Sequence, residues 1–362
     1  MEIGRIPGSA IPLRYSLQHV SQCFVPPMAS TSYTSYTNVV AHSNLSEFKS
    51  KNRMFILGMG FVSQSLAHKL RDQGWDVSGT CTSHMKKKKL EDKGFRVYLF
   101  DADELEPSAL DVMKDYTHLL VSVPPVVGIG DLVLQHEDLL RSSLVTGNLQ
   151  WLGYLSSTAP GVYGDFGGEL VDEDYPTKPS SQLAKLRLAS EAGWSNLARH
   201  LGFSPQVFRL GGIYGPGRSA IDTIIKQEPL SEGQKMRKNR KYTSRVHIED
   251  ICQALMAAIY TPSSKKIYNI VDDDPAPREV VFEYARKLVE KKWPGLIRQP
   301  TEELKSSIIE TRNERGEKRV SNARMKQELG VRLLYPDYRS GLQSIIDQME
   351  TPFHGAHSHL IV

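Results

Sequence analysis

The sequence predicts an α/β protein built on a doubly wound, Rossmann-type parallel sheet. Two observations support this fold class. Patterns typical of buried strands and amphipathic helices alternate along most of the 362 residues, which favours a parallel sheet. Residues 54–70 also join four consecutive apolar residues to Gly58-Met59-Gly60 and then to apolar positions at helical spacing, a strand, glycine turn and helix in succession.

This first turn is the first candidate binding site. Gly58 would let the chain turn tightly, and Gly60 would let the backbone approach a pyrophosphate at the helix N-terminus, beside Phe61 and Val62. The third position of the dinucleotide fingerprint is Ser63 instead of Gly or Ala. Serine is small enough for close packing of helix on strand. The alternative is an ordinary tight turn, and the segments downstream favour dinucleotide binding.

Composition excludes several classes of function. The net charge of +4 is mild and no basic face with interleaved aromatics accompanies it, which argues against a nucleic-acid partner. No run approaches the roughly 18 apolar residues of a membrane span. The three cysteines, Cys23, Cys81 and Cys252, match no metal or disulfide spacing. We therefore expect no metal and a reducing compartment.

The N-terminal stretch differs from the rest of the chain. Residues 3–46 contain no Asp or Glu, while Ser and Thr are frequent and Arg5 and Arg14 add positive charge. This composition is typical of an organelle transit peptide, and the alternative is a merely disordered leader. We expect residues 1–50 to direct import into the chloroplast stroma, with mitochondrial or cytoplasmic location as alternatives. Met28 is an alternative start.

The end of the second expected strand, residues 75–80, bears on the choice of cofactor. A carboxylate at this position binds the ribose of NAD, whereas a cation accommodates the 2′-phosphate of NADP. The chain has no carboxylate here, and Thr82, Ser83 and Lys86 follow. These residues favour NADP over NAD as the cofactor. The alternative is that the lysine run is the solvated first turn of a helix.

The next two strands add further contacts to a cofactor. The third, residues 95–100, ends in Asp101, whose carboxylate is placed to accept a hydrogen bond from the adenine amino group. The fourth, residues 117–123, stops at Pro124-Pro125. Proline cannot donate to a strand ladder, so we expect Pro124 to hold the chain extended beside the cofactor.

A hydroxyl cluster follows the fifth expected strand. A helix over residues 131–144 returns the chain to a strand over 149–155, which delivers Ser156, Ser157 and Thr158. Ligands of open α/β sheets bind beyond the carboxyl ends of the strands, so this cluster is placed to face a substrate. The alternative is that these hydroxyls bond the backbone of a turn.

Two later segments carry weaker signals. Residues 234–245 contain six cations, which would suit an anionic substrate, with a solvated surface loop as the alternative. The tail carries His354, His357 and His359. No acidic or cysteine partner accompanies these histidines, so they do not predict a metal site.

Five motifs in order resemble the extended and atypical branches of the short-chain dehydrogenase/reductase superfamily, which include NAD-dependent epimerase/dehydratase-like proteins. They are residues 58–60, residues 155–158 with 162–165, Arg209 with 213–217, residues 245–250 and residues 268–273. The resemblance implies a Rossmann core over residues 51–210 and a smaller C-terminal substrate lid over residues 211–362. The leader adds the expectation of a plant-type, plastid-targeted member.

The resemblance also implies catalytic roles. Ser157, with Thr158 beside it, falls where the family polarises the substrate hydroxyl or carbonyl. The family's general acid/base is a Tyr four residues before a Lys. Aligning on Glu191 places Leu183 at the Tyr and Arg187 at the Lys, whereas a shift of two places Ser181 and Lys185 there. Neither register supplies the Tyr, and Arg187 is left to bind the nicotinamide ribose or a substrate anion.

A substitute base would have to come from elsewhere in the chain. Tyr163, Asp165, Tyr214 and His247 are the candidates. His247 has the most suitable ordinary pKa, about 6.5, and its alternative role is to order the loop before its helix. Two functions follow as hypotheses: an NAD(P)-dependent oxidoreductase or epimerase-like enzyme on a small polar or anionic substrate, or a non-catalytic NAD(P)-binding redox sensor or scaffold. Oligomeric state and substrate identity stay open.

Overall fold

Seven parallel strands form the centre of the fold, in the order β10-β7-β5-β4-β1-β2-β3. The order reverses next to β1, so the prediction of a doubly wound, Rossmann-type sheet is confirmed. The strands are β1 (Arg53–Leu57), β2 (Asp76–Cys81), β3 (Arg96–Leu99), β4 (His118–Val121), β5 (Trp151–Ser157), β7 (Gln206–Leu210) and β10 (Ile267–Ile270).

The computed structural model describes residues 52–100, 111–158, 162–202, 204–227, 242–261, 267–297 and 318–352. All of these lie in one unit, Lys49–Val362. The expected leader, Asp101, residues 234–241 of the basic segment and the three tail histidines lie outside the described residues. Within the described ranges, no helix is long and apolar enough to cross a membrane.

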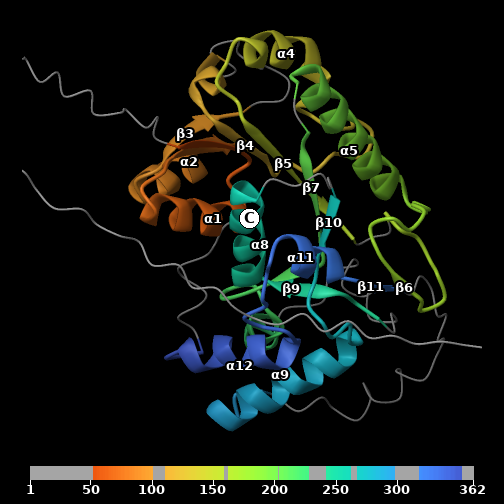
Figure 1. Ribbon diagram of the computed structural model, residues 1–362. Helices are drawn as coiled ribbons and strands as arrows, with labels where there is room; N and C mark the ends of the chain where they lie inside the picture. The colour runs from red at the N-terminus through yellow and green to blue at the C-terminus, as the bar shows by residue number, and fades with distance from the viewer. Residues whose placement is uncertain are drawn as a thin grey trace, which may run out of the picture. The chain divides into compact units, whose positions relative to one another are not determined.

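Helices cover both faces of the sheet (Figure 1). One face carries α1 (Phe61–Asp72), α2 (His84–Asp92), α8 (Ile248–Tyr260) and α11 (Ala323–Glu328). The other carries α4 (Glu137–Val145), α5 (Gln182–His200) and the short 3₁₀ turns η1 (Val112–Asp115) and η2 (Leu134–His136). Helix α8 buries Ile251, Ala254, Leu255 and Ala258, the helical spacing that the sequence shows.

A third group of helices forms the smaller C-terminal part, at the lower end of Figure 1. Helices α6 (Ala220–Lys226), α9 (Arg278–Lys292) and α12 (Tyr338–Gln348) share an apolar core of their own. The chain after residue 210 nevertheless contributes to both parts, because β10 pairs with β7 in the main sheet and α8 packs on α1.

Two short parallel pairs complete the described architecture. They are β8 (Gly212–Tyr214) with β9 (Arg245–His247), and β6 (Leu170–Val171) with β11 (Arg319–Val320). The sequence predicts none of these four strands and does not predict α6. Strands of two or three residues are too short to show a period, so only the pairing of distant segments reveals them.

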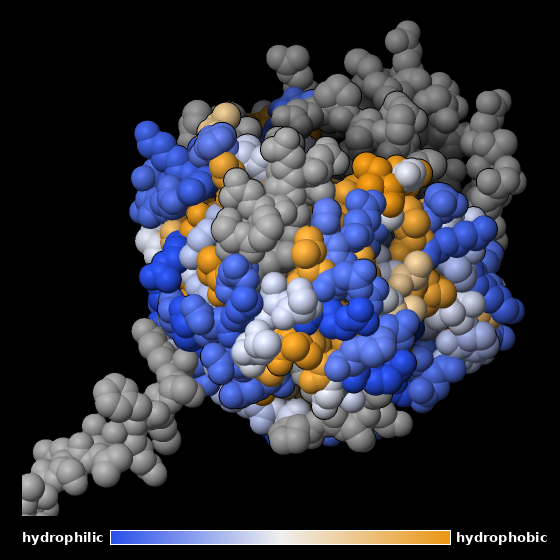
Figure 2. All heavy atoms as spheres, turned by 90° about the horizontal axis from the view of Figure 1, so that it is seen from above, coloured by the Kyte–Doolittle hydropathy of each residue, from blue (hydrophilic) through white to orange (hydrophobic). Residues whose placement is uncertain are grey.

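Two boundaries differ from those expected, one because of a local side-chain contact and one because of strand pairing. The helix expected over residues 131–144 divides into η2 and α4, because an Asp131 carboxylate oxygen accepts hydrogen bonds from the backbone N–H groups of Val133 and Leu134. Strand β5 extends to Ser157, since Ser157 pairs with Leu210 of β7. On the face shown in Figure 2, hydrophilic side chains predominate and apolar ones form small separate patches.

Candidate functional site

The first turn has a geometry that only glycine accommodates at Gly58. Its φ is +91°, and a Cβ there would lie 3.0 Å from Cγ2 of Val123, in a region of backbone space that favours glycine. Thr80 holds the turn from the neighbouring strand: its Oγ1 accepts from Gly58 N at 2.9 Å and its carbonyl from Met59 N at 2.8 Å. The sequence marks Thr80 as one of the hydroxyls at the end of the second strand, but it did not predict that Thr80 bonds the first turn.

Gly60 opens the start of α1 to a ligand. A Cβ built on Gly60 would have no heavy atom within 4 Å, and no side chain caps the helix or adds an acidic group to its first turn. The N–H groups of that turn, starting with Phe61 and Val62, have no partner within the helix. A helix N-terminus of this kind binds anions. The four predicted residues of this turn therefore fit the pyrophosphate of a dinucleotide.

The residues after β2 lie together around the start of α2. Thr82 and Ser83 are exposed and Lys86 is half-buried. Ser83 also caps α2, because its Oγ accepts from Lys86 N at 3.3 Å. The lysine run is indeed the beginning of a helix, and the hydroxyls and N-terminal dipole are compatible with a phosphate at that end.

The chain beyond β4 borders the first turn. Ser122 N donates to Leu57 O at 2.8 Å, and the exposed Pro124 follows two residues later. The next loop presents exposed Val126, Val127 and Ile129. These apolar side chains were not singled out from the sequence, and they place an apolar surface at the carboxyl end of β4.

Ser157 and Thr158 lie at the carboxyl end of β5 and share one acceptor. The Leu210 carbonyl accepts from Thr158 N at 2.9 Å, from Thr158 Oγ1 at 3.2 Å and from Ser157 Oγ at 3.4 Å. Thr158 is buried, whereas Ser157 is half-buried. Both hydroxyls therefore contact the backbone as the local alternative expects. Ser157, with the longer bond and the greater exposure, is the one able to turn toward a ligand.

A buried polar network lies beneath this hydroxyl cluster. Ser156 Oγ donates to Glu191 at 2.5 Å, and Arg209 forms an ion pair with Glu191 at 2.8 Å. Arg209 also donates to the Tyr163 hydroxyl at 2.8 Å, which in turn donates to Asn269 Oδ1 at 2.7 Å. Burial raises the pKa of Tyr163. This placement favours a structural role for Tyr163 over the proton transfer expected of it.

The same network fixes which face of helix α5 is turned toward the sheet. Glu191 points into the buried network, so Leu183 and Arg187, two turns and one turn earlier, lie on the same side of the helix. Both are half-buried, whereas Lys185 is exposed. Burial lowers the pKa of Arg187. This difference in burial favours the register with Leu183 at the family's Tyr position over the register with Ser181.

His247 begins α8 as its cap. Its Nδ1 accepts from Glu249 N at 3.2 Å, which places the ring proton on Nε2. The ring packs between Tyr214 and Tyr335, with centroid distances of 5.2 and 4.1 Å, and the residue is 2% exposed. Burial lowers the pKa of His247 to about 4. This geometry favours the loop-ordering role.

The structure also shows where Asp165 and Tyr214 lie, the other two candidates for a substitute base. Asp165 is exposed, and its carboxylate accepts from Gly167 N at 3.0 Å. Tyr214 is buried and its hydroxyl donates to Asp337 O at 3.4 Å. Neither contact joins these groups to Ser157.

Acid is expected to weaken the fold through His247. Unfolded histidine takes up a proton near its ordinary pKa of 6.5, whereas folded His247 does so only near pH 4. Between these values the unfolded state binds more protons, so the free energy of unfolding falls as the pH drops, by at most about 1.4 kcal/mol per pH unit. His247→Asn keeps an acceptor for Glu249 N. In this variant the free energy of unfolding, measured with urea, should fall less steeply between about pH 7 and pH 5 than in the unchanged chain.

The matched control is His200→Asn, since His200 is exposed at the end of α5. It should retain the slope of the unchanged chain. If the free energy of unfolding falls with pH equally steeply in His247→Asn and in the unchanged chain, His247 is not the group responsible.

One contact between the later chain and the first turn escaped sequence reasoning. Gly215 and Arg218 close a tight turn by mutual backbone hydrogen bonds of 3.1 and 3.0 Å. The Arg218 guanidinium lies over the Phe61 ring, 5.4 Å from its centroid, within cation–π range. The only sequence signal is an arginine directly after Tyr-Gly-Pro-Gly.

Fold and site together define a dinucleotide-binding α/β protein with a smaller C-terminal helical part. The carboxyl ends of β1, β2, β4 and β5 bring the glycine turn, Thr82, Pro124 and Ser157 to one edge of the sheet. Across the described part of the chain, no group of three His, Cys, Asp or Glu side chains is arranged to hold a metal ion.

Comparison with known proteins agrees with this class. Residues 54–271 match the NAD dependent epimerase/dehydratase family, and the chain belongs to that family. The family description implies an NAD(P) cofactor.

Three similar proteins show how far the likeness extends. Protein YeeZ of Escherichia coli strain K12 is 27% identical over 293 residues, covering 79% of this chain and 97% of YeeZ. A functionally unknown conserved protein from Silicibacter pomeroyi DSS is 31% identical, with a TM-score of 0.65, covering 83% of this chain and all of that one. UDP-glucuronic acid 4-epimerase from Bacillus cereus, in complex with NAD, is 16% identical with a TM-score of 0.60, covering 82% and 96%; this likeness shows the fold alone.

Proposed function

We propose that the protein is an NAD(P)-dependent oxidoreductase or epimerase-like enzyme that acts on a small polar or anionic substrate. The observation that carries the proposal is the open, uncapped start of α1 at Gly60, at the same sheet edge as the half-buried Ser157. A cofactor bound at that helix start would run along the edge on which Ser157 presents its hydroxyl.

We further propose NADP as the preferred cofactor. The end of β2 supplies Thr82, Ser83 and Lys86 and no carboxylate, so nothing there repels a 2′-phosphate. The B. cereus epimerase was solved with NAD, so a preference for NADP would belong to this chain's own residues. Binding of NADPH and NADH, measured side by side, tests the preference.

In this proposal, the cofactor and the residues of the site have separate roles. The bound cofactor supplies hydride transfer. Ser157 donates its hydroxyl to a substrate hydroxyl or carbonyl oxygen, and Arg187 takes the role of the family's Lys in binding the nicotinamide ribose or a substrate anion. Leu183 supplies no proton, and positioned acid/base catalysis is worth about 10²- to 10⁴-fold in rate. We therefore expect slow turnover.

The rival function is a non-catalytic NAD(P)-binding redox sensor or scaffold. A specific observation favours it: Tyr163 and His247 are buried and bonded elsewhere, and the resemblance supplies no tyrosine on α5 in either register. In that case the nucleotide would stabilise the fold or report redox state to a partner, without chemistry on a substrate.

Ser157→Ala separates the two functions. Small hydroxy and keto compounds, neutral and anionic, are screened by the change in NADPH absorbance. On a compound that turns over, the variant should lose about 10²-fold in kcat, while NADPH affinity stays within about twofold.

Ser142→Ala is the control, because this exposed α4 serine likewise donates to a backbone carbonyl, that of Leu139. It should change neither quantity. Parallel loss of kcat and NADPH affinity would make Ser157 structural. Tight NADPH binding without turnover on any compound would favour the sensor.

A further inference from the structure

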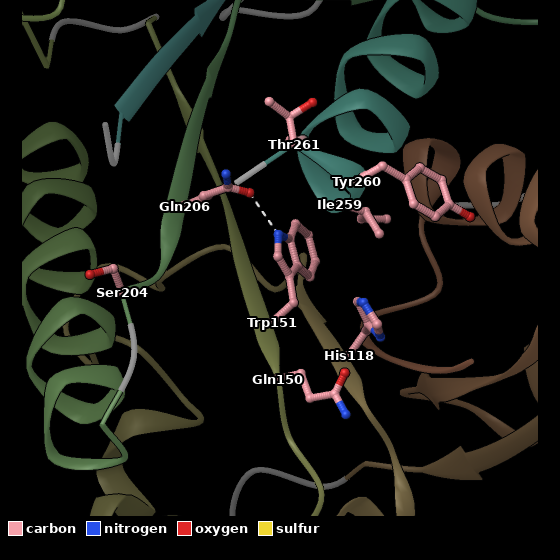
Figure 3. Close-up of a pocket in the computed structure, with 9 residues that line it drawn as sticks. His118, Gln150, Trp151, Ser204, Gln206, Ile259, Tyr260 and Thr261 are labelled. Carbon is pink, nitrogen blue, oxygen red and sulfur yellow. Dashed lines mark hydrogen bonds between the residues drawn. The ribbon is translucent and has the colours of Figure 1, made fainter. Parts of the chain in front are cut away.

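A pocket of about 310 Å³ opens at the amino end of the sheet (Figure 3). Its wall includes His118, Trp151 and Gln206, the first residues of β4, β5 and β7, together with Tyr260 and Thr261 at the end of α8. The seven strands are parallel, so this edge lies opposite to the one that carries Gly60 and Ser157. The pocket is therefore separate from the cofactor site.

Aromatic rings form a connected wall at this edge. Trp75 donates through Nε1 to the Tyr260 hydroxyl at 3.0 Å, and its ring lies edge-on to His118 at 4.7 Å between centroids. His118 lies 6.0 Å from Trp151. Tyr260 is 55% exposed, so its ring is accessible to a ligand. Because these rings pack against one another, they lose little conformational entropy when a ligand packs on them, and they offer it an apolar contact surface.

The hydrogen-bonding groups of the wall have defined polarity. Trp151 Nε1 donates to Gln206 Oε1 at 2.6 Å, which leaves the Gln206 amide nitrogen as a donor. Thr117 Oγ1 has one proton and two neighbouring acceptors, Arg53 O at 3.0 Å and His118 Nδ1 at 2.8 Å. We assign the proton to the bond with Arg53 O, which makes His118 Nδ1 the donor to Thr117 Oγ1. His118 Nε2 is then an acceptor.

Among the described residues that line the pocket, no side chain carries a formal charge at neutral pH. Burial lowers the pKa of His118 to about 4, and the other side chains that line the pocket are amides, hydroxyls, aromatics or aliphatics. The described lining residues therefore offer an anionic ligand no cation and a cationic ligand no carboxylate. The volume is at the lower end of small-molecule pockets, which suits a ligand of one or two rings.

We propose that this pocket is a second ligand site, which binds a small uncharged ring compound carrying both hydrogen-bond donors and acceptors on its edge. Two sources share this chemistry: nucleosides, whose bases stack on aromatic rings, and neutral sugars, whose C–H faces pack on them. The site does not depend on the cofactor turn or on Ser157.

The test uses the full chain saturated with NADPH, so that the cofactor site is blocked. Adenosine and methyl glucoside are titrated separately as probes, with saturation-transfer NMR as the readout. Tyr260→Ala should raise the Kd of the bound probe about tenfold. Gln206→Met removes the amide donor at similar volume and should weaken the same probe.

Tyr175→Ala is the control, because Tyr175 belongs to the loop after β6 and does not line the pocket. It should leave the Kd unchanged. Saturable binding of adenosine alone would assign nucleosides as the ligands of the pocket. Saturable binding of methyl glucoside alone would assign neutral sugars as its ligands. No saturable binding of either probe, or binding that Tyr260→Ala and Gln206→Met leave intact, overturns the proposal. NADPH binding is measured in the same samples, so failure here is distinct from failure of the proposed function.

Discussion

Replacing Arg209 by methionine is expected to lower the free energy of unfolding by about 3–5 kcal/mol. Arg209 and Glu191 form a buried ion pair at 2.8 Å with side chains 3% and 5% exposed. Methionine fills a similar volume but leaves the Glu191 carboxylate in a low-dielectric interior without its cation. The Tyr163 hydroxyl loses a donor at the same time. Urea unfolding followed by circular dichroism measures the change.

Two further variants decide whether the lost charge pairing is the cause. Arg209→Met combined with Glu191→Leu removes both charges and should recover part of the lost stability, because no unpaired charge stays buried. Lys87→Met breaks an exposed pair, Lys87 with Glu91 at 3.8 Å, and should cost less than about 1 kcal/mol. A double variant no more stable than Arg209→Met alone would point to lost packing instead.

Replacing Gly60 by valine is expected to abolish the rise in melting temperature caused by NADPH or NADH. The φ of Gly60 is −84° and a Cβ there meets no protein atom within 4 Å, so the variant should fold with a nearly unchanged melting temperature. The branched side chain would occupy the space that the pyrophosphate needs and raise the Kd about 10²-fold or more. Thermal unfolding with and without each dinucleotide measures both effects.

Gly58→Ala provides the matched contrast in the same turn. Alanine at φ +91°, with its Cβ 3.0 Å from Val123, strains the turn itself. We therefore expect a lower melting temperature even without cofactor. An undiminished NADPH shift in Gly60→Val, or no shift in the unchanged chain, would refute dinucleotide binding at this turn.

Sequence reasoning placed best those residues whose roles are local. Gly58, Gly60 and Pro124 follow directly from short patterns, because a strand, a glycine turn and a helix are encoded within a few neighbouring residues. Ser157 was likewise expected at a strand end, where the structure has it. Its shared acceptor, the Leu210 carbonyl, lies on another strand and could not be read from neighbouring residues.

The roles of titratable residues were predicted least well. Tyr163 and His247 had the right chemistry for a proton donor, yet burial and partners decide what a titratable group does. Tyr163 bonds Arg209 and Asn269, which are 46 and 106 residues away along the chain. The pocket at the amino end of the sheet gave no sequence signal, since its wall combines strand starts with the end of α8.

The sequence by itself determined the fold class and the glycine turn after β1, because apolar periodicity and two glycines act over a few residues and need no distant partner. It also showed that neither register of residues 181–187 supplies the family's catalytic tyrosine. Only the tertiary structure decided that Glu191 is buried against Arg209, and which tyrosines and histidines are sealed from solvent. Burial and pairing depend on residues far apart in the chain, and the folded packing alone brings those residues together.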